Sequence, residues 1–167
     1  NGTHYTPADV VSDSSTQFKD AYGGDGFEAI WHNVDSDKMI GSAQNNFFFK
    51  TVNGGDSWFL ATNGIDDAIS PFVSRLSNSR LIPDRLYAIA STGVYISEDF
   101  GDNWELEIIS SDLWSFSSNT SNVEVSFGDP NVIWAGGYMS DNRRLFVSTN
   151  AGQTFTNTEN YAGATMG

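Results

Sequence analysis

Short apolar runs alternate with turn-forming residues along the whole chain, and the runs recur in groups of four. The three groups occupy residues 27–32, 39–43, 47–50 and 59–61; then 72–76, 86–90, 94–96 and 105–109; then 123–127, 132–136, 145–147 and 156–158. No stretch of helical length shows a convincing 3.6-residue period of apolar positions. The pattern therefore predicts an all-β chain with about three units of four short strands.

An octapeptide lies between the third and fourth run of each group. Its three copies occupy residues 51–58, 97–104 and 148–155. Each copy reads Ser or Thr, any residue, Asp or Asn, any residue, Gly, any residue, Ser, Thr or Asn, and then an aromatic residue. The third positions lie 46 residues apart (53 to 99) and then 51 residues apart (99 to 150). Because the flanking runs repeat in register with it, the octapeptide marks a true structural repeat.

Three positions of the octapeptide are predicted to shape a tight turn. The third-position side chain is expected to bond backbone amides two residues on, the glycine to accept a positive φ, and the aromatic ring to fold back over the turn. These residues are Asn53, Gly55 and Trp58; Asp99, Gly101 and Trp104; and Asn150, Gly152 and Phe155. Since an amide replaces the carboxylate in two copies and cannot act as a general base, the pattern favours a structural role over a catalytic one.

The octapeptides resemble the Asp-boxes, or bacterial-neuraminidase-type (BNR) repeats, of sialidases, xyloglucan-cleaving endoglucanases, sortilin-type receptors and photosystem assembly factors. Further elements are similar to those of secreted bacterial propeller proteins: Asn1-Gly2-Thr3, Gly23-Gly24-Asp25-Gly26-Phe27, Pro71-Phe72-Val73 and Asp129-Pro130-Asn131. This resemblance implies a β-propeller made of four-stranded antiparallel blades. It also implies a secreted, extracellular or cell-surface location.

The resemblance divides the chain into blades at about residues 24–62, 70–110 and 122–160 of a single propeller segment, 1–167. Residues 1–23 would then form the end of a preceding blade or a connection. Propellers typically have 4–8 blades, so three do not close a ring. We expect a partial propeller or a fragment of one with six to eight blades. Alternatively, further copies of the chain supply the missing blades.

The sequence departs from the enzymes that carry Asp-boxes. Sialidases require an arginine triad, and the five arginines here, Arg75, Arg80, Arg85, Arg143 and Arg144, lack matching contexts. Endoglucanase relatives use two aspartates, whereas only Asp25, in its glycine-rich loop, is a candidate here. The resemblance therefore favours a non-catalytic module for adhesion or for glycan or protein binding. Two alternatives stay open: part of a glycoside hydrolase whose active site is completed elsewhere, and a scaffold for assembling a protein complex.

Composition narrows the possible partners. The 21 acidic residues outnumber the 8 Lys and Arg residues, which gives a formal net charge of −13. Such a surface is repelled by nucleic acid and by anionic lipid headgroups, although solubility alone explains the charge. The chain has no cysteine, which rules out disulfides and thiol ligands. No apolar run approaches the roughly 20 residues of a membrane-spanning helix.

A few residues outside the repeats are candidates for ligand contact. Aromatic side chains on polar loops often face sugars, so Trp114, Tyr22 and Tyr138 are candidate ligand-binding residues, with packing between blades as the alternative for Trp114. Asp66 and Asp67 lie on a blade connection and are expected to be solvated. His32 ends an apolar run and is expected to be packed, and no histidine has zinc-site spacing. The sequence predicts no bound metal or cofactor.

Overall fold

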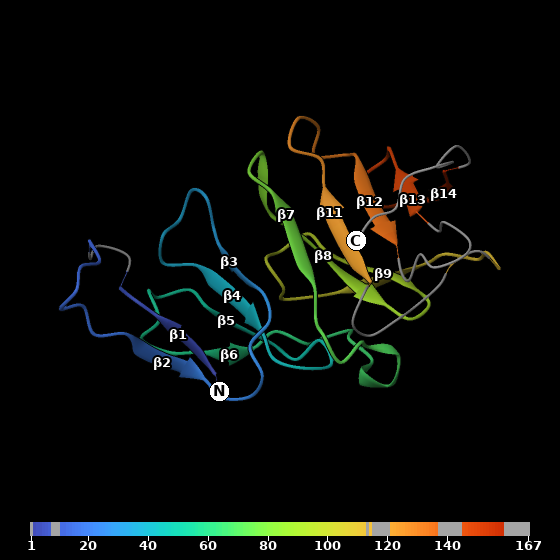
Figure 1. The fold of residues 1–167 in the computed structure, drawn as a ribbon. Coiled ribbons are helices and arrows are strands. Elements are labelled where there is room, and N and C mark those ends of the chain that lie inside the picture. The colour runs from blue at the N-terminus through green and yellow to red at the C-terminus, as the bar shows by residue number, and fades with distance from the viewer. Residues whose placement is uncertain (1, 8–10, 113, 115–120, 137–144, 159–167) are drawn as a thin grey trace.

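The computed structural model of the chain describes residues 2–7, 11–112, 114, 121–136 and 145–158. These residues form one antiparallel hairpin and three four-stranded antiparallel sheets (Figure 1). The hairpin consists of β1 (Thr3–Tyr5) and β2 (Lys19–Tyr22). The first sheet consists of β3 (Ala29–Trp31), β4 (Met39–Ser42), β5 (Phe48–Thr51) and β6 (Phe59–Leu60). The second consists of β7 (Leu76–Ser79), β8 (Ile82–Ala90), β9 (Gly93–Ser97) and β10 (Glu105–Ile108). The third consists of β11 (Asn122–Val125), β12 (Ile133–Gly136), β13 (Leu145–Ser148) and β14 (Thr156–Asn157).

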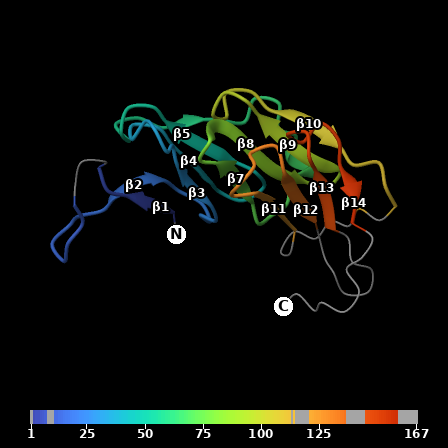
Figure 2. The same cartoon turned by 90° about the horizontal axis from the view of Figure 1, so that it is seen from above.

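Each sheet is a simple meander in which every strand pairs with the next along the chain. The hairpin and the sheets follow one another across the molecule in chain order (Figures 1 and 2). The first strands of the three sheets are neighbours, since β7 contacts both β3 and β11. Within the described residues the one helical turn is a 3-10 turn at Asp67–Ile69. That part of the chain contains no helix long and apolar enough to cross a membrane.

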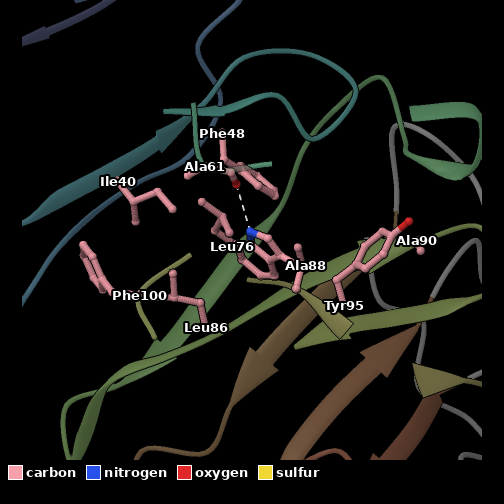
Figure 3. Close-up of a cluster of buried hydrophobic side chains, with 10 residues drawn as sticks. Ile40, Phe48, Ala61, Leu76, Leu86, Ala88, Ala90, Tyr95 and Phe100 are labelled. Atoms are coloured by element: carbon pink, nitrogen blue, oxygen red, sulfur yellow. Dashed lines mark hydrogen bonds between the residues drawn. The ribbon is translucent and has the colours of Figure 1, made fainter. Parts of the chain in front are cut away.

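Two apolar clusters fill the spaces between the sheets. The first, between the first and second sheets, comprises Ile40, Phe48, Ala61, Leu76, Leu86, Ala88, Ala90, Tyr95, Phe100 and Trp104 (Figure 3). The second, between the second and third sheets, comprises Tyr87, Ile89, Val94, Ile109, Val123, Ile133, Ala135 and Phe146. Neighbouring residues of β8 alternate between the two clusters, since successive side chains of a strand point to opposite faces. The second sheet is therefore buried on both faces.

The second sheet departs from the predicted strand positions. Its first strand was predicted at residues 72–76 but begins at Leu76. The preceding segment is tied to the first sheet instead: Asn45 N–H donates to the Phe72 carbonyl at 3.3 Å, and Ser74 Oγ donates to the Ala43 carbonyl at 2.7 Å. These bonds tie the segment to the loop between β4 and β5 instead of pairing it with β8.

The turn before residues 86–90 does not lie at Pro83-Asp84, although proline and aspartate are typical turn residues. The chain reverses at Arg80-Leu81, and β8 starts at Ile82. Residues 83–85 bulge out of the ladder, because Ser79 pairs with Ile82 while the adjacent Asn78 pairs with Leu86. A proline lacks the N–H that a regular ladder requires, so a bulge accommodates it. The bulge also turns the side chains after Pro83 toward the neighbouring sheets.

Candidate functional site

The three octapeptides, Asp-box 1 (51–58), Asp-box 2 (97–104) and Asp-box 3 (148–155), fold into turns with the same side-chain hydrogen bonds. In Asp-box 2 the first-position hydroxyl, Ser97 Oγ, accepts from the Gly101 amide at 2.8 Å and donates to Asp99 Oδ1 at 2.9 Å. Asp99 Oδ1 also accepts from the Asn103 amide at 2.9 Å. The same three bonds recur in Asp-box 1, from Thr51 and Asn53, and in Asp-box 3, from Ser148 and Asn150.

The predicted partner of the third-position side chain was wrong. It bonds the amide four residues on rather than two, while the first-position hydroxyl accepts from the amides at positions three and five. The fourth position, which three different residues occupy, is left-handed as well: Gly54, Phe100 and Ala151 have φ values of 67°, 56° and 60°. Two consecutive left-handed residues reverse the chain tightly enough for the side-chain bonds to close.

Each Asp-box packs against the unit that precedes it. A Cβ at Gly101 would lie 2.8 Å from Ile40 Cδ1 of the first sheet, and one at Gly152 would lie 2.7 Å from Ile96 Cδ1 of the second. A Cβ at Gly55 would overlap the ring of Tyr5 in the hairpin. The fifth-position glycine therefore has a second role in all three copies: it leaves room for a side chain from the preceding unit.

A hydrogen bond accompanies each of these apolar contacts. Tyr5 Oη donates to the Gly55 carbonyl at 2.7 Å, Lys50 Nζ to the Phe100 carbonyl at 3.2 Å, and Tyr87 Oη to the Ala151 carbonyl at 3.2 Å. Burial raises the pKa of Tyr87 to about 12, so its hydroxyl stays protonated as a donor. A hydrogen bond from the preceding unit thus reaches every Asp-box, at the fifth-position carbonyl in Asp-box 1 and at the fourth-position carbonyl in Asp-boxes 2 and 3.

A groove of about 380 Å³ opens between the second and third sheets. Its lining comprises Arg85, Ile96, Glu98, Asp99, Asn103, Glu105, Leu106, Glu107, Ala151 and Gln153. Arg85 lies in the bulge of β8, where its Nε donates to Glu98 across the ladder at 2.8 Å. Its Nη1 is buried and has no hydrogen-bond partner among the described residues. The groove therefore combines an unused N–H donor with several carboxylates.

Solved β-propellers resemble this fold. An ancestral GH74 enzyme aligns at 15% identity and a TM-score of 0.58, over 81% of this chain and 18% of its own. GH74 from Niastella koreensis aligns at 14% and 0.57, over 81% and 23%. YCF48 from Cyanidioschyzon merolae aligns at 18% and 0.51, over 79% and 36%, and YCF48 bound to D1 peptide at 11% and 0.55, over 80% and 40%. The fold is that of a β-propeller segment.

The fold class predicted from the repeats, three four-stranded antiparallel blades of a partial propeller, is thus confirmed. The chain spans about a fifth to two fifths of the length of these propellers. No protein-family model and no curated protein matches the sequence. The structural likeness, at under 20% identity, establishes the fold of the propeller segment but not its function. The function depends on the residues of this chain.

Two of the predicted site residues lie between the hairpin and the first sheet. Asp25 is partly buried in the connection from β2 to β3, where its amide donates to Gln44 Oε1 at 3.2 Å. Tyr22 stacks on Phe49 with ring centroids 4.5 Å apart and meets Trp58 at 5.4 Å. Burial raises the pKa of Tyr22. Tyr22 therefore packs the hairpin against the first sheet, and the backbone of Asp25 is bonded to the loop between β4 and β5.

Trp114 lies at the other boundary, between the second and third sheets. Its indole N–H donates to the Ser91 carbonyl at 3.0 Å, and its ring meets Phe146 edge-on at 5.5 Å. The indole is therefore engaged in packing, the alternative considered for it above. Tyr138 lies outside the described residues. The structure thus does not bring together the described ligand candidates, Asp25, Tyr22 and Trp114.

A polar cluster joins the first and second sheets near Asp-box 2. His32 is buried, and its Nδ1 accepts from the Asp35 amide at 2.9 Å, so the proton of the neutral ring lies on Nε2. Nε2 lies 3.3 Å from Asp84 Oδ1, and Lys38 Nζ lies 3.0 Å from the same oxygen. Among the described residues, no three His, Cys, Asp or Glu side chains are grouped so as to hold a metal. We assign the cluster a role in joining the sheets.

The loop acids Asp66 and Asp67 are exposed, as expected, and Asp66 also has a local structural role. Asp66 Oδ1 accepts from the Ala68 amide at 3.0 Å and caps the 3-10 turn at Asp67–Ile69. The Asp66 amide in turn donates to Tyr95 Oη at 3.0 Å. This connection is therefore anchored to the second sheet.

Sequence reasoning missed the groove. One signal was available: the repeat alignment places Arg85 immediately before Leu86 and Glu98 immediately after Ser97, and Leu86 pairs with Ser97. Opposite charges at facing positions on neighbouring strands indicate a cross-strand ion pair. The sequence does not predict that Asp-box 3 also lines the groove. Ala151 lies 66 residues beyond Arg85 (85 to 151), and the repeat pattern does not indicate which residues of different sheets are in contact.

Asp99 provides a direct test of the structural role of the boxes. Replacing Asp99 by alanine should lower the free energy of unfolding by about 2–3 kcal/mol, since it removes the acceptor for Ser97 and Asn103. Asp99→Asn should cost only about 1 kcal/mol, because its amide would face the Asn103 amide at Oδ2. The double variant Asp99→Asn/Asn103→Ser copies Asp-box 1 and should recover that loss. Urea unfolding measures all three.

The pH dependence of stability should change with the same residue. Burial raises the pKa of Asp99, but hydrogen bonds from Asn103 and Ser97 outweigh this and hold it below its usual value of 3.8. The carboxylate therefore stabilises the fold above the unfolded-state pKa, and this contribution is lost as pH falls through the lower folded-state pKa. Asp99→Asn/Asn103→Ser should be less sensitive to acid than the parent. Equal acid sensitivity would contradict the assignment.

Proposed function

We propose that this chain is a non-catalytic binding segment of a larger secreted β-propeller protein. Its groove between the second and third sheets is the binding site, and its ligand is a basic, extended segment of a partner protein. The observation that supports this is the lining of the groove, where one guanidinium, Arg85, stands against four carboxylates, for a net charge of −3. Such a lining attracts Lys and Arg side chains and disfavours anionic ligands.

The edge of the second sheet suits an extended ligand. In the described residues β10 pairs only with β9, so the other side of β10 is unpaired. An extended peptide can add to such an edge through backbone hydrogen bonds and use its side chains for specificity. Glu105 and Glu107 are two residues apart on β10 and share one face, which matches the side-chain repeat of an added strand.

Two further observations favour a protein ligand and binding without catalysis. The described lining contains no aromatic side chain on which a sugar ring could stack. Both carboxylate oxygens of Asp99 are already bonded within Asp-box 2, so this acid is not available as a proton donor or acceptor. The likeness to YCF48 bound to D1 peptide supports peptide binding by a propeller of similar fold.

The second candidate function is that of a segment of a glycoside hydrolase. The fold likeness to two GH74 enzymes favours it. Asp25 would then be the acid that this segment contributes, with the second acid supplied by another part of the protein.

Binding of a labelled Lys/Arg-rich peptide, measured by fluorescence anisotropy, tests the proposal. The variant Glu105→Gln/Glu107→Gln should bind about tenfold more weakly, because each lost ion pair is worth up to about 1 kcal/mol. The control Asp37→Asn/Asp56→Asn changes the net charge equally at exposed acids outside the groove and should bind like the parent. A glycan panel, assayed for binding and hydrolysis, runs beside it.

Each other outcome identifies a different conclusion. An equal loss of peptide binding in both double variants would show that general charge attraction, and not the groove, binds the peptide. Hydrolysis of a glycan that disappears with Asp25→Asn would favour the hydrolase. Glycan binding that is unchanged in Glu105→Gln/Glu107→Gln would place the ligand on another surface.

A further inference from the structure

The face of the third sheet turned away from the second sheet carries the residues that receive an Asp-box elsewhere in the chain. Strand pairing gives the equivalent positions: Ile40 faces Lys50 in the first sheet, Tyr87 faces Ile96 in the second, and Trp134 faces Val147 in the third. In every sheet this pair lies next to the pair that contains the first residue of the Asp-box. We call these three the receiving pairs.

The first two receiving pairs are covered by the following Asp-box. Ile40 packs on Gly101 while Lys50 Nζ donates to the Phe100 carbonyl. Ile96 packs on Gly152 while Tyr87 Oη donates to the Ala151 carbonyl. Each pair thus supplies an apolar contact and one long side chain that donates a hydrogen bond.

The third receiving pair has the same chemistry but is not covered by the described residues. Trp134 is 37% exposed, whereas its equivalents Ile40 and Tyr87 are 1% and 0% exposed. Its indole ring provides apolar area, and its Nε1–H provides the donor that Tyr87 provides one sheet earlier. Val147 is the small apolar partner in the position of Ile96.

We propose that Trp134 and Val147 bind a fourth Asp-box, carried by a four-stranded sheet from polypeptide outside these 167 residues. The fifth-position glycine of that box rests on Trp134, and the indole N–H donates to a carbonyl of its turn. The interface continues the two already present and repeats their geometry. It uses a different surface from the groove of the proposed function, so either proposal can fail alone.

A second copy of the chain does not fit this face. Its three Asp-box glycines are already covered, by Tyr5, Ile40 and Ile96. A formal charge of −13 on each copy also opposes close association of two copies.

The test appends one repeat in register. Because Trp104 and Phe155 are equivalent eighth positions, Thr158 corresponds to Glu107, so residues 108–167 can follow residue 158 of the chain. Hydroxyl-radical footprinting then compares Trp134 in the 167-residue chain and in the extended chain. Oxidation of the original Trp134 should fall about tenfold, from the level of a 37% exposed side chain to that of its buried equivalents. Trp31, 44% exposed, is the internal control and should not change.

A variant of the appended copy and a measurement of oligomeric state complete the test. Gly152→Glu in the appended copy alone should restore oxidation of the original Trp134, because the added side chain cannot be accommodated on the indole. Sedimentation of the 167-residue chain should show a monomer. Equal oxidation of Trp134 in both chains, protection that survives Gly152→Glu, or a dimer that protects Trp134 would each overturn the proposal.

Discussion

Replacing Trp104 by alanine is expected to lower the free energy of unfolding by about 3–5 kcal/mol, the usual cost of removing a large buried aromatic side chain. Trp104 is the eighth residue of Asp-box 2 and is 4% exposed. Its ring centroid lies 5.1 Å from that of Phe48 in β5, and its indole N–H donates to the carbonyl of Ala61, directly after β6, at 2.9 Å. The substitution therefore removes contacts between two sheets and leaves a buried carbonyl without its donor.

Two other substitutions separate the causes of this loss. Trp104→Phe keeps much of the ring but removes the N–H, and should cost about 1–3 kcal/mol because the Ala61 carbonyl is left unsatisfied. Trp31→Ala removes a ring of the same size that is 44% exposed, and should change stability by about 0.5 kcal/mol or less. Urea unfolding followed by circular dichroism measures all three. A cost below about 1 kcal/mol for Trp104→Ala would mean that the packing between these sheets is much looser than its geometry indicates.

The sequence identified the Asp-boxes and the three sheets because these features repeat. One octapeptide fits many structures, but Asn53, Asp99 and Asn150 recur with the same strand pattern around them. A structure proposed for one copy therefore has to fit the other two copies as well. The local bonding was harder to predict, since Ser or Thr at the first position and Asp or Asn at the third compete for the same amides. Which acceptor receives which amide depends on the two left-handed residues between them.

The departures from prediction lie where the repeat is broken by contacts across sheets. Proline is usually a turn residue, yet Pro83 lies in a bulge of β8. That bulge sends Asp84 toward His32 of the first sheet and Arg85 toward the groove beside Asp-box 3. Such contacts join residues tens of positions apart, and a repeat pattern carries no information about them. The same limit applies to Trp114, whose partners Ser91 and Phe146 lie on different sheets.

Gly64→Ala is expected to lower the free energy of unfolding by about 2–4 kcal/mol, from left-handed backbone strain and overpacking together. Gly64 lies on the connection between the first and second sheets with a φ of +94°, which a residue with a Cβ rarely adopts. A Cβ there would also overlap the Trp104 carbonyl oxygen. The adjacent Asn63 accepts the Trp104 amide at 2.9 Å, so the connection cannot move away without breaking that bond.

The design separates strain from overlap. Gly64→Asn should cost less than Gly64→Ala, because asparagine tolerates a positive φ while keeping the overlap with Trp104. Gly128→Ala is the matched control: a Cβ at Gly128 meets no atom within 4 Å, and its φ lies outside the left-handed range, so stability should change by about 0.5 kcal/mol or less. If Gly64→Ala were as mild as Gly128→Ala, the connection would not be held against Asp-box 2. Because the same connection carries the chain from one sheet to the next, a large effect at Gly64 would show that the Asp-box fixes its own turn and also the placement of the sheet before it.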